Sequence, residues 1–320
     1  METITVIGSL NMDLVVRTPR VPQAGETLAG ADFHIIPGGK GANQAVACAR
    51  AGAPTRLIGC VGEDIFASQL LQSLEASGVD ISGVSRVNGV SSGTATILVD
   101  DRGQNRIIYV PGANARLSTD TIRQQFARSC ETRLVLLQHE IPLQTVHDII
   151  ELAHARDIHV MLNPAPFYPI PERLMAQIDT LILNEIEATA LSGLGVVDPR
   201  TARQAAEVLL RQGVVNVIIT LGEQGALLFG RQGELFQPAF KVNAVDSTAA
   251  GDTFTGGYAA SIMVGKEPPA ALLYATAAAA LCVTRLGAQT SIPTREEVQD
   301  FLAAHTGRTA LNRPRLYEGN

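Results

Sequence analysis

The sequence predicts a doubly wound α/β fold, in which helices flank a mostly parallel β-sheet. Short apolar runs alternate along the chain with segments of helical period. Several runs are apolar at odd and even positions alike, which is typical of parallel strands covered on both faces. The segments between them place apolar residues at i, i+3, i+4 and i+7, the pattern of helices with one buried face. Together these observations predict the doubly wound class.

The elements follow in chain order. The strands of the main sheet are predicted at residues 4–7, 56–60, 134–137, 159–162, 181–183 and 214–219, and the clearest helical stripes at 67–74, 146–153 and 202–209. Two segments interrupt the alternation. Residues 13–36 are rich in Pro and Gly, and residues 94–110 have the alternation of a β-hairpin. We expect these two segments to form a small antiparallel β lid on a single domain of residues 1–305, followed by a polar, loosely ordered tail at 306–320.

Composition narrows the class of protein. A chain of 320 residues can bury a substantial core, and its net charge of −6 without a basic stripe argues against nucleic-acid or anionic-membrane binding. The N-terminus lacks the pattern of a signal peptide, and the apolar stretch 270–283 is too short to span a bilayer, so it predicts a buried helix. The four cysteines are far apart, without a C-x-x-C pair. They predict reduced thiols and a cytoplasmic protein.

Polar residues follow the predicted strands. Asn11 and Asp13 come after the first strand, Glu140 after 134–137, Asn184 after 181–183 and Thr220 after 214–219. In an open parallel sheet ligands bind outside the carboxyl ends of the strands. The sequence therefore predicts a binding site built from several strand ends along one edge of the sheet.

The segment 246–254, Asp-Ser-Thr-Ala-Ala-Gly-Asp-Thr-Phe, leads into a predicted helix. A helix N-terminus offers unpaired N–H groups and partial positive charge to an anion. Ala249, Ala250 and Gly251 leave the approach free, and Asp252 places a carboxylate beside it. An anion site next to a base is what phosphoryl transfer to a hydroxyl requires. The alternative interpretation is that Asp252 only caps the helix.

The segment 38–45, Gly-Gly-Lys-Gly-Ala-Asn-Gln-Ala, is the second glycine-rich element. Its spacing matches neither a Walker A loop nor G-x-G-x-x-G, so it does not predict a P-loop or a dinucleotide site. Lys40 and Asn43 supply donors and acceptors that suit a polyhydroxylated ligand. The alternative is a flexible glycine turn before a helix.

These motifs, in this order, resemble the PfkB family of carbohydrate kinases, from Ile4 to about Leu302. The resemblance rests on the opening Gly-Ser-Leu-Asn-Met-Asp (8–13), on segments 38–45 and 246–254, and on Asn-Glu-Ile-Glu (184–187). It implies a ribokinase-like fold and ATP-dependent phosphorylation of D-ribose at the 5-hydroxyl. The alternatives are a kinase for 2-deoxyribose or a related sugar or nucleoside, a sugar-binding sensor without catalysis, and a purely structural subunit.

The resemblance also implies roles for individual residues. Asp252 would be the general base, and the backbone N–H groups of 249–252 would stabilise the transferring phosphoryl group. The sugar would be bound by Asn11, Met12, Asp13, Gly39, Lys40, Gly41, Ala42, Asn43, Glu140 and Asp252. ATP would be bound by Asn184, Thr220, Leu221, Gly222, Glu223, Gln224, Gly225, Gly251, Asp252 and Thr276.

The resemblance further implies two bound ions and a second copy of the chain. Magnesium would sit mainly on phosphate oxygens and water, with Asn184 and Glu187 acting at one remove. A monovalent cation, potassium, would lie at Asp246, Thr248, Cys282, Arg285, Gly287 and Ser291, mostly on backbone carbonyls. The β lid would cover the sugar and pair with a second copy of the chain to form a homodimer.

Overall fold

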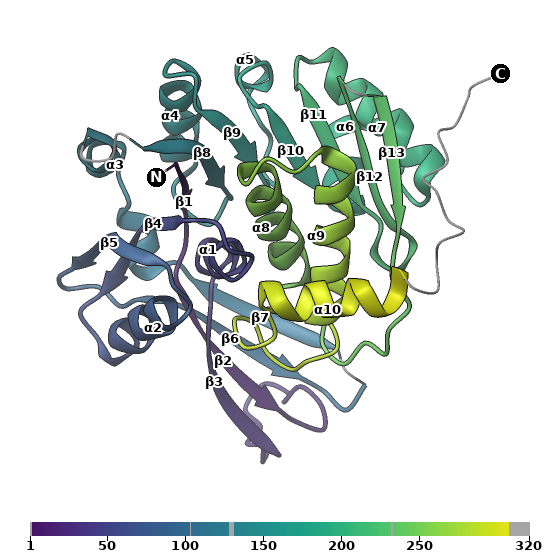
Figure 1. Ribbon diagram of the computed structural model, residues 1–320. Coiled ribbons are helices and arrows are strands. Elements are labelled where there is room, and N and C mark those ends of the chain that lie inside the picture. Colours follow the sequence, from purple (N-terminus) through teal and green to yellow (C-terminus); the bar gives the residue numbers. More distant parts are fainter. Residues whose placement is uncertain (1, 103, 128–130, 232, 307–320) are drawn as a thin grey trace.

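The computed structural model describes residues 2–102, 104–127, 131–231 and 233–306 (Figure 1). Its main sheet has the strand order β13-β12-β11-β10-β9-β8-β1-β4-β5. The strands from β5 to β11 are parallel, whereas β12 and β13 continue the sheet in antiparallel fashion. Their bounds are β1 Thr3–Ile7, β4 Thr55–Gly62, β5 Asp80–Val87, β8 Thr132–Leu137, β9 His159–Leu162, β10 Thr180–Leu183, β11 Asn216–Thr220, β12 Gly225–Gly230 and β13 Gly233–Pro238.

The predicted doubly wound fold is confirmed, because helices cover both faces of the main sheet (Figure 1). They are α1 Lys40–Arg50, α2 Ile65–Ala76, α3 Thr119–Ala127, α4 Leu143–His154, α5 Glu172–Met175, α6 Glu185–Ser192, α7 Pro199–Arg211, α8 Ala250–Met263, α9 Pro268–Cys282 and α10 Arg295–Thr306, with short 3₁₀ turns η1 Gly112–Arg116 and η2 Gly222–Gln224. Along β8, Val135 and Leu137 join the apolar layer under α3–α7, whereas Leu134 and Leu136 join the layer under α1, α2, α8 and α9. The continuous apolar run of this strand therefore contributes side chains to the apolar layers on both faces of the sheet.

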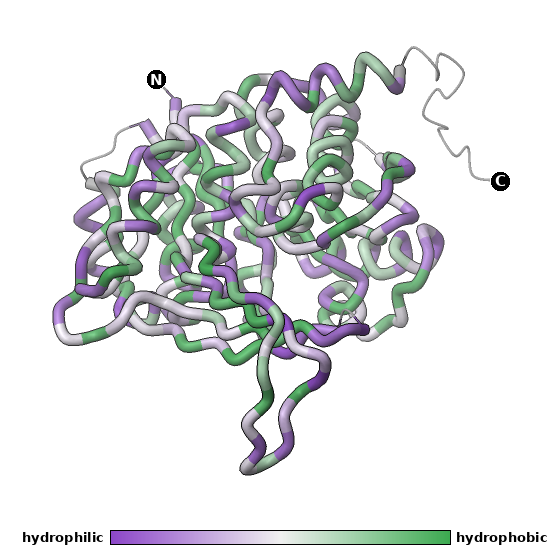
Figure 2. The backbone as a smooth tube through the Cα atoms, turned by 90° about the horizontal axis from the view of Figure 1, so that it is seen from below, coloured by the Kyte–Doolittle hydropathy of each residue, from purple (hydrophilic) through white to green (hydrophobic). Residues whose placement is uncertain are grey.

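The lid is a second sheet of four strands, in the order β3-β2-β6-β7. Its strands are β2 Asn11–Arg17, β3 Asp32–Gly38, β6 Gly93–Val99 and β7 Asn105–Val110. The β2–β3 and β6–β7 pairs are antiparallel as predicted, but the central β2–β6 pair is parallel. The reason is topological: β2 follows β1, and β6 follows β5. Because β1 and β5 run in the same direction in the main sheet, the chain enters β2 and β6 in the same direction. Figure 2, seen from below, shows a lid segment projecting from the body of the molecule.

Residues 270–283 fall almost entirely in the buried helix α9. Among the described residues, no helix has the length and apolar character needed to cross a membrane. Cys48, Cys60 and Cys282 are buried free thiols, whereas Cys130 and the expected tail beyond residue 306 lie outside the described residues.

Candidate active site

The helices α1 and α8 begin at the carboxyl edge of the main sheet and pack closely side by side. Gly256 makes this approach possible, since a Cβ there would lie 2.5 Å from Ala47 Cβ and 2.7 Å from the Gln44 carbonyl oxygen. The predicted strand-end residues occupy the same edge, after β1, β8, β10 and β11. The two glycine-rich segments, distant in sequence, are thus brought together over the ends of the central strands.

Asp252 lies in the first turn of α8, two residues after its first residue, and is 6% exposed. The helix is capped by Ala249, which has no capping side chain, so the interpretation of Asp252 as an N-cap is wrong. Its carboxylate accepts hydrogen bonds from Asn43 Nδ2 (2.9 Å) and Gln44 Nε2 (3.0 Å), both on α1. Two neutral amides therefore fix the carboxylate without neutralising its charge.

The backbone before Asp252 forms an open cradle. Ala249 has a left-handed φ of 60°, a conformation that costs a non-glycine residue about 1–2 kcal/mol. A Cβ on Gly251 would meet no atom within 4 Å. The Ala250 N–H is bonded to the Ser247 carbonyl at 3.2 Å, which leaves the N–H groups of Gly251 and Asp252 as donors at the helix start. The turn can therefore receive an anion beside a carboxylate.

Glu140 is the centre of the opposite wall of the site. Its Oε2 accepts hydrogen bonds from Ser9 Oγ (2.5 Å), the Lys40 backbone N–H (3.1 Å) and Asn11 Nδ2 (3.3 Å). No donor among the described residues reaches its other oxygen, Oε1. The contacts hold one oxygen of the carboxylate and leave the second to accept a hydrogen bond from a ligand.

The glycines of segment 38–45 serve backbone packing. Gly39 has φ +90°, and a Cβ on it would lie 2.6 Å from the Asn11 backbone nitrogen. A Cβ on Gly41 would lie 2.5 Å from the Ser9 nitrogen. These residues let the start of α1 rest against the β1–β2 connection, which places Lys40 and Asn43 in the site. The tight packing contradicts the interpretation as a flexible glycine turn, and the assignment of Lys40 and Asn43 to a polyhydroxylated ligand stays a prediction.

Carboxylates gather around Lys40. Burial, with the nearby charges of Glu140 and Asp252, raises the pKa of Asp13 to about 7, although Lys40 opposes the rise. Burial alone would lower the pKa of Lys40, but attraction to Asp252 and Glu140 outweighs it and the pKa is raised. The lysine is therefore a permanent positive charge among carboxylates, one of which titrates near neutrality.

Two of the residues predicted to bind the sugar are core residues. Met12 and Ala42 are fully buried and pack in the apolar layer between the sheet and α1. Any contact of these positions with a ligand would have to use the backbone.

The predicted nucleotide residues surround the ends of β10 and β11. Residues 220–225 run from the last residue of β11 through η2 into β12, and Thr220 Oγ1 donates to the Leu183 carbonyl at 3.3 Å. Gly225 has φ +126°, and a Cβ there would lie 2.1 Å from the Gln237 oxygen. This glycine is therefore required by the β12–β13 pairing. Residues 222–224 are exposed.

Asn184 and Glu187 form a capping box at the start of α6. Asn184 Oδ1 accepts from the Glu187 N–H at 2.8 Å, and Glu187 Oε2 accepts from the Asn184 N–H at 3.0 Å. Burial raises the pKa of Glu187. The N-x-x-E segment thus has a structural role, and Glu187 retains one carboxylate oxygen outside the cap. Thr276 lies on α9, where its hydroxyl donates to the Leu272 carbonyl at 2.8 Å.

The residues predicted to bind a monovalent cation do come together. Asp246 Oδ1 accepts from the Thr248 N–H (2.9 Å) and hydroxyl (2.6 Å), and its Oδ2 accepts from the Gly287 N–H (3.0 Å). Cys282 Sγ contacts the Thr248 carbonyl oxygen (3.6 Å) and Ser291 Oγ (3.1 Å). The side chains are largely occupied with one another, so an ion here would depend on backbone carbonyls.

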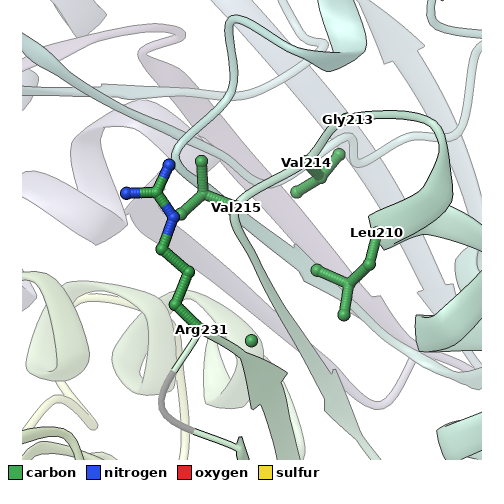
Figure 3. A pocket seen from close by; sticks show the side chains of 6 residues that line it. Leu210, Gly213, Val214, Val215 and Arg231 are labelled. Atoms are coloured by element: carbon green, nitrogen blue, oxygen red, sulfur yellow. The ribbon is translucent and has the colours of Figure 1, made fainter.

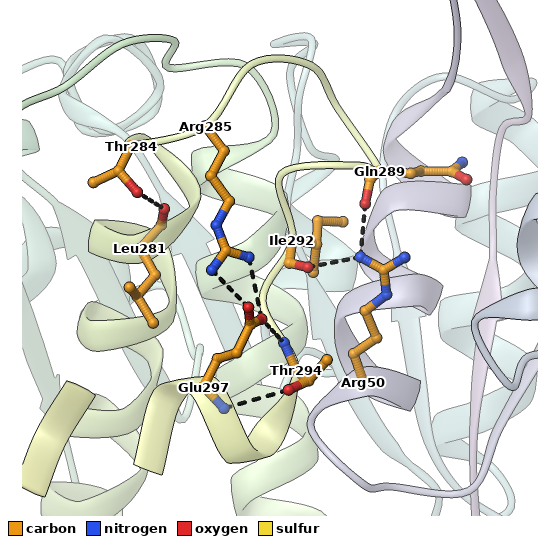
Figure 4. Close-up of polar contacts among 8 residues, drawn as sticks. All are labelled: Arg50, Leu281, Thr284, Arg285, Gln289, Ile292, Thr294 and Glu297. Carbon is orange, nitrogen blue, oxygen red and sulfur yellow. Dashed lines mark hydrogen bonds and ion pairs between the residues drawn. The ribbon is translucent and has the colours of Figure 1, made fainter. Parts of the chain in front are cut away.

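The side chain of Arg285 points away from this cluster. Its guanidinium pairs with the Glu297 carboxylate at 3.1 and 2.7 Å (Figure 4). Nearby, Arg50 at the end of α1 donates to the carbonyls of Gln289 (2.8 Å) and Ile292 (2.6 Å). The loop after α9 is therefore tied both to α10 and to the helix that carries Asn43.

Sequence reasoning missed two side chains that build the site. Gln44 bonds Asp252 and also Asn163 (3.1 Å). The only sequence signal for it is its place beside Asn43 in a motif already noted. Asn114 is fully buried and donates to Asn11 Oδ1 at 2.7 Å. Its partner is 103 residues away in sequence, so no local pattern could have identified it.

A hollow of about 290 Å³ lies elsewhere, lined by residues including Leu210, Gly213 and Arg231 (Figure 3). Its lining residues precede β11 or lie at the end of β12, so it is at the amino end of β11. The candidate active site is at the carboxyl ends of the parallel strands, and this hollow is not part of it.

Comparison with known proteins shows which family the chain matches. A family model described as pfkB family carbohydrate kinase matches residues 1–295. A ribokinase from Haemophilus influenzae is 39% identical over 301 residues, 94% of this chain and 98% of its own. A deoxyribokinase from Salmonella typhi is 38% identical over 301 residues, with the same coverage. The structure of Arabidopsis thaliana ribokinase complexed with ribose and ATP superposes with a TM-score of 0.86 at 33% identity, covering 94% of this chain and 99% of that one.

Proposed function

This chain belongs to the pfkB family of carbohydrate kinases, and on that premise we propose that it transfers the γ-phosphoryl group of ATP to the 5-hydroxyl of D-ribose. The products are D-ribose 5-phosphate and ADP. One observation carries the proposal: the Asp252 carboxylate is held by Asn43 and Gln44 next to the open first turn of α8. A base and an anion cradle are therefore adjacent.

The mechanism follows from these groups. Asp252 accepts the proton of the 5-hydroxyl as that oxygen attacks the γ-phosphorus, and the bond from phosphorus to the β,γ-bridging oxygen of ATP breaks. The N–H groups of Gly251 and Asp252 stabilise the negative charge of the transferring group. Orientation of the two substrates contributes about 7–11 kcal/mol of barrier lowering, and a positioned base about 10²–10⁴-fold in rate.

Ribose is favoured as the substrate by the polar side chains that surround the proposed sugar site. Asp13, Lys40, Asn43 and Glu140 supply fixed donors and acceptors, and a sugar without a hydroxyl would leave buried partners unpaired. The second candidate is 2-deoxyribose, because a relative 38% identical to this chain is named deoxyribokinase.

Both ions of the proposal fit the donors present. Magnesium supplies charge neutralisation on the phosphates, and hard oxygen ligands, mainly phosphate and water, suit it. Asn184 and the Glu187 oxygen outside the capping box are the groups that would orient the hydrated magnesium and phosphates. For potassium, the support is the convergence of Asp246, Thr248 and the loop after α9.

We further propose that the lid pairs with a second copy. Paired residues of neighbouring strands lie on one face of a sheet, and the register places Ile35 and Ile108 on the face opposite Asp13 and Tyr109. Ile35 is 47% and Ile108 66% exposed, an apolar surface that suits burial against another lid. Ile108→Lys should shift sedimentation from dimer to monomer, whereas Val264→Lys, at an exposed apolar position outside the lid, should not. A monomeric parent protein would contradict this part of the proposal.

The first test is a coupled ADP-release assay with Mg-ATP and potassium. D-ribose, 2-deoxyribose, fructose and adenosine are compared at limiting concentration. The highest kcat/KM is expected for D-ribose. A preference for another compound would retain the kinase mechanism and replace the substrate. No turnover, together with ribose binding by calorimetry, would favour a sugar-binding sensor.

A further inference from the structure

Asn114 is a buried residue of η1, the turn that follows the last lid strand β7. Its side-chain amide bonds both backbone groups of Leu10: Oδ1 accepts from the Leu10 N–H (3.0 Å), and Nδ2 donates to the Leu10 carbonyl (3.1 Å). A backbone N–H can only donate and a carbonyl can only accept, so this pair of bonds determines which end of the Asn114 amide carries the nitrogen.

The second hydrogen of Asn114 Nδ2 determines the orientation of the next amide. It is donated to Asn11 Oδ1 at 2.7 Å, which turns the Asn11 NH₂ group toward Glu140 Oε2 at 3.3 Å. If Asn11 were reversed, its oxygen would face the Glu140 carboxylate and its nitrogen would face the Asn114 nitrogen. Both new contacts would lack a hydrogen bond.

The two amides have no room to move out of contact with each other. A Cβ on Gly93, at the start of β6, would lie 2.2 Å from both Asn11 Oδ1 and Asn114 Nδ2. Asn114 is 0% and Asn11 3% exposed, so solvent cannot replace a lost partner. The backbone groups of Leu10 therefore determine the amide orientation of Asn114. Asn114 in turn determines the amide orientation of Asn11, whose NH₂ group faces Glu140.

We propose that Asn114 is a positioning residue for sugar recognition. It fixes Asn11 with its NH₂ group toward the sugar site, so that Asn11 presents a donor there and Glu140 Oε1 remains the free acceptor. This inference rests on the proposed function, because it assumes that Asn11 and Glu140 contact the sugar. Asn114 itself touches neither substrate and acts only through Asn11.

The test is Asn114→Asp, which replaces the amide by a carboxylate of nearly the same shape that cannot donate a hydrogen bond. The new carboxylate would face the Leu10 carbonyl and Asn11 Oδ1, and Asn11 would reverse to meet it. We expect the KM for the sugar to rise at least about tenfold, as for the loss of a buried charge-assisted hydrogen bond, and the KM for ATP to stay within about twofold. Asn216→Asp is the matched control: Asn216 Nδ2 donates to the Asp179 carbonyl (3.1 Å) at the far end of β11, so the control should leave both KM values unchanged.

A double-mutant cycle separates positioning from general damage. If Asn114 acts through Asn11, Asn114→Asp should raise the sugar KM no further in an Asn11→Ala protein. Additive effects in the two backgrounds, or equal rises in the KM for sugar and ATP, would overturn the inference. If Asn114→Asp does not fold, Asn114→Ala is put through the same cycle and judged by the same criteria. Each assay uses the sugar that the parent protein phosphorylates best, so failure of ribose as substrate would be seen in the parent alone.

Discussion

The two halves of the candidate active site are built in different ways. The proposed sugar half, around α1, β2 and Glu140, is built on buried side chains that form hydrogen bonds within the site: Asn11, Asn43 and Gln44 are each at most 5% exposed. The proposed nucleotide half, formed by residues 220–225 and 246–251, consists of turns and a helix start, where most residues are exposed or half-buried. The Ala249 φ of 60° and the empty space at Gly251 belong to this second half.

This difference indicates how each substrate is recognised. A sugar is distinguished by the positions of its hydroxyls, and fixed donors and acceptors read those positions because mismatches leave buried groups unpaired. Phosphates need positive potential and N–H groups, which backbone supplies without particular side chains. We therefore expect substitutions in the sugar half to alter stability and sugar KM together, and those in the nucleotide half to alter turnover with little change in stability.

The largest effect is expected where the halves meet, at Asp252. Asp252→Asn removes the base and should lower kcat by about 10²–10⁴-fold, while sugar and ATP still bind. The new amide would present its NH₂ group to Asn43 or Gln44, so the free energy of unfolding should fall by about 1–3 kcal/mol. Steady-state kinetics, calorimetric binding and urea unfolding measure the three quantities. A near-normal kcat would contradict the assignment of Asp252 as base.

Two glycines provide a direct contrast between the halves. Gly251→Ala adds a methyl group in open space within a helix, where alanine is favoured by about 0.5–1 kcal/mol, yet the methyl group lies beside the proposed phosphoryl site. We expect unchanged or higher melting temperature with kcat reduced about 10²-fold. Gly41→Ala should behave in the opposite way, losing about 1–3 kcal/mol of stability because its Cβ would lie 2.5 Å from the Ser9 nitrogen. Equal loss of stability in both variants would contradict the proposed difference between the two halves of the site.

The sequence predicted the fold and the strand ends that carry the proposed site residues better than the internal support of the proposed sugar half. Apolar runs and helical periods are local signals, and all six predicted strands of the main sheet are present. The predicted strand-end residues came together because parallel strands share one carboxyl edge. Asn114 could not be predicted, because its orientation depends on a turn that only the folded lid brings to Leu10. The parallel β2–β6 pair was also missed, because local alternation does not specify the direction of a neighbouring strand.

The sugar half should also respond to pH through Asp13. Its pKa in the folded protein is about 7 against an ordinary 3.8, so the folded protein binds a proton that the unfolded chain loses between those values. Stability should therefore fall as pH rises from about 4 to about 7 and level off above. Ionised Asp13 is the stronger acceptor for a sugar hydroxyl, so kcat/KM for the sugar should fall about fivefold as pH is lowered from 7 to 6. Asp13→Asn should abolish both trends. If the variant kept the pH dependence of the parent protein, the two trends would have to come from another group.

The smallest effect is expected at Cys282, the last residue of α9, which lies beside the nucleotide half. Its thiol contacts the Thr248 carbonyl (3.6 Å) and Ser291 Oγ (3.1 Å), two groups at the proposed potassium site. A thiol is a weak donor, and the loss of such a contact changes binding by at most about 1 kcal/mol, or about fivefold. Cys282→Ala should therefore shift the potassium concentration for half-maximal activity by up to about fivefold, since the Thr248 carbonyl is released to coordinate an ion, while the sugar KM stays constant. Activity is measured in potassium, sodium and a large organic cation. Equal activity of the parent protein in all three would contradict the ion site itself, whereas a changed sugar KM in Cys282→Ala would show that the two halves are not independent.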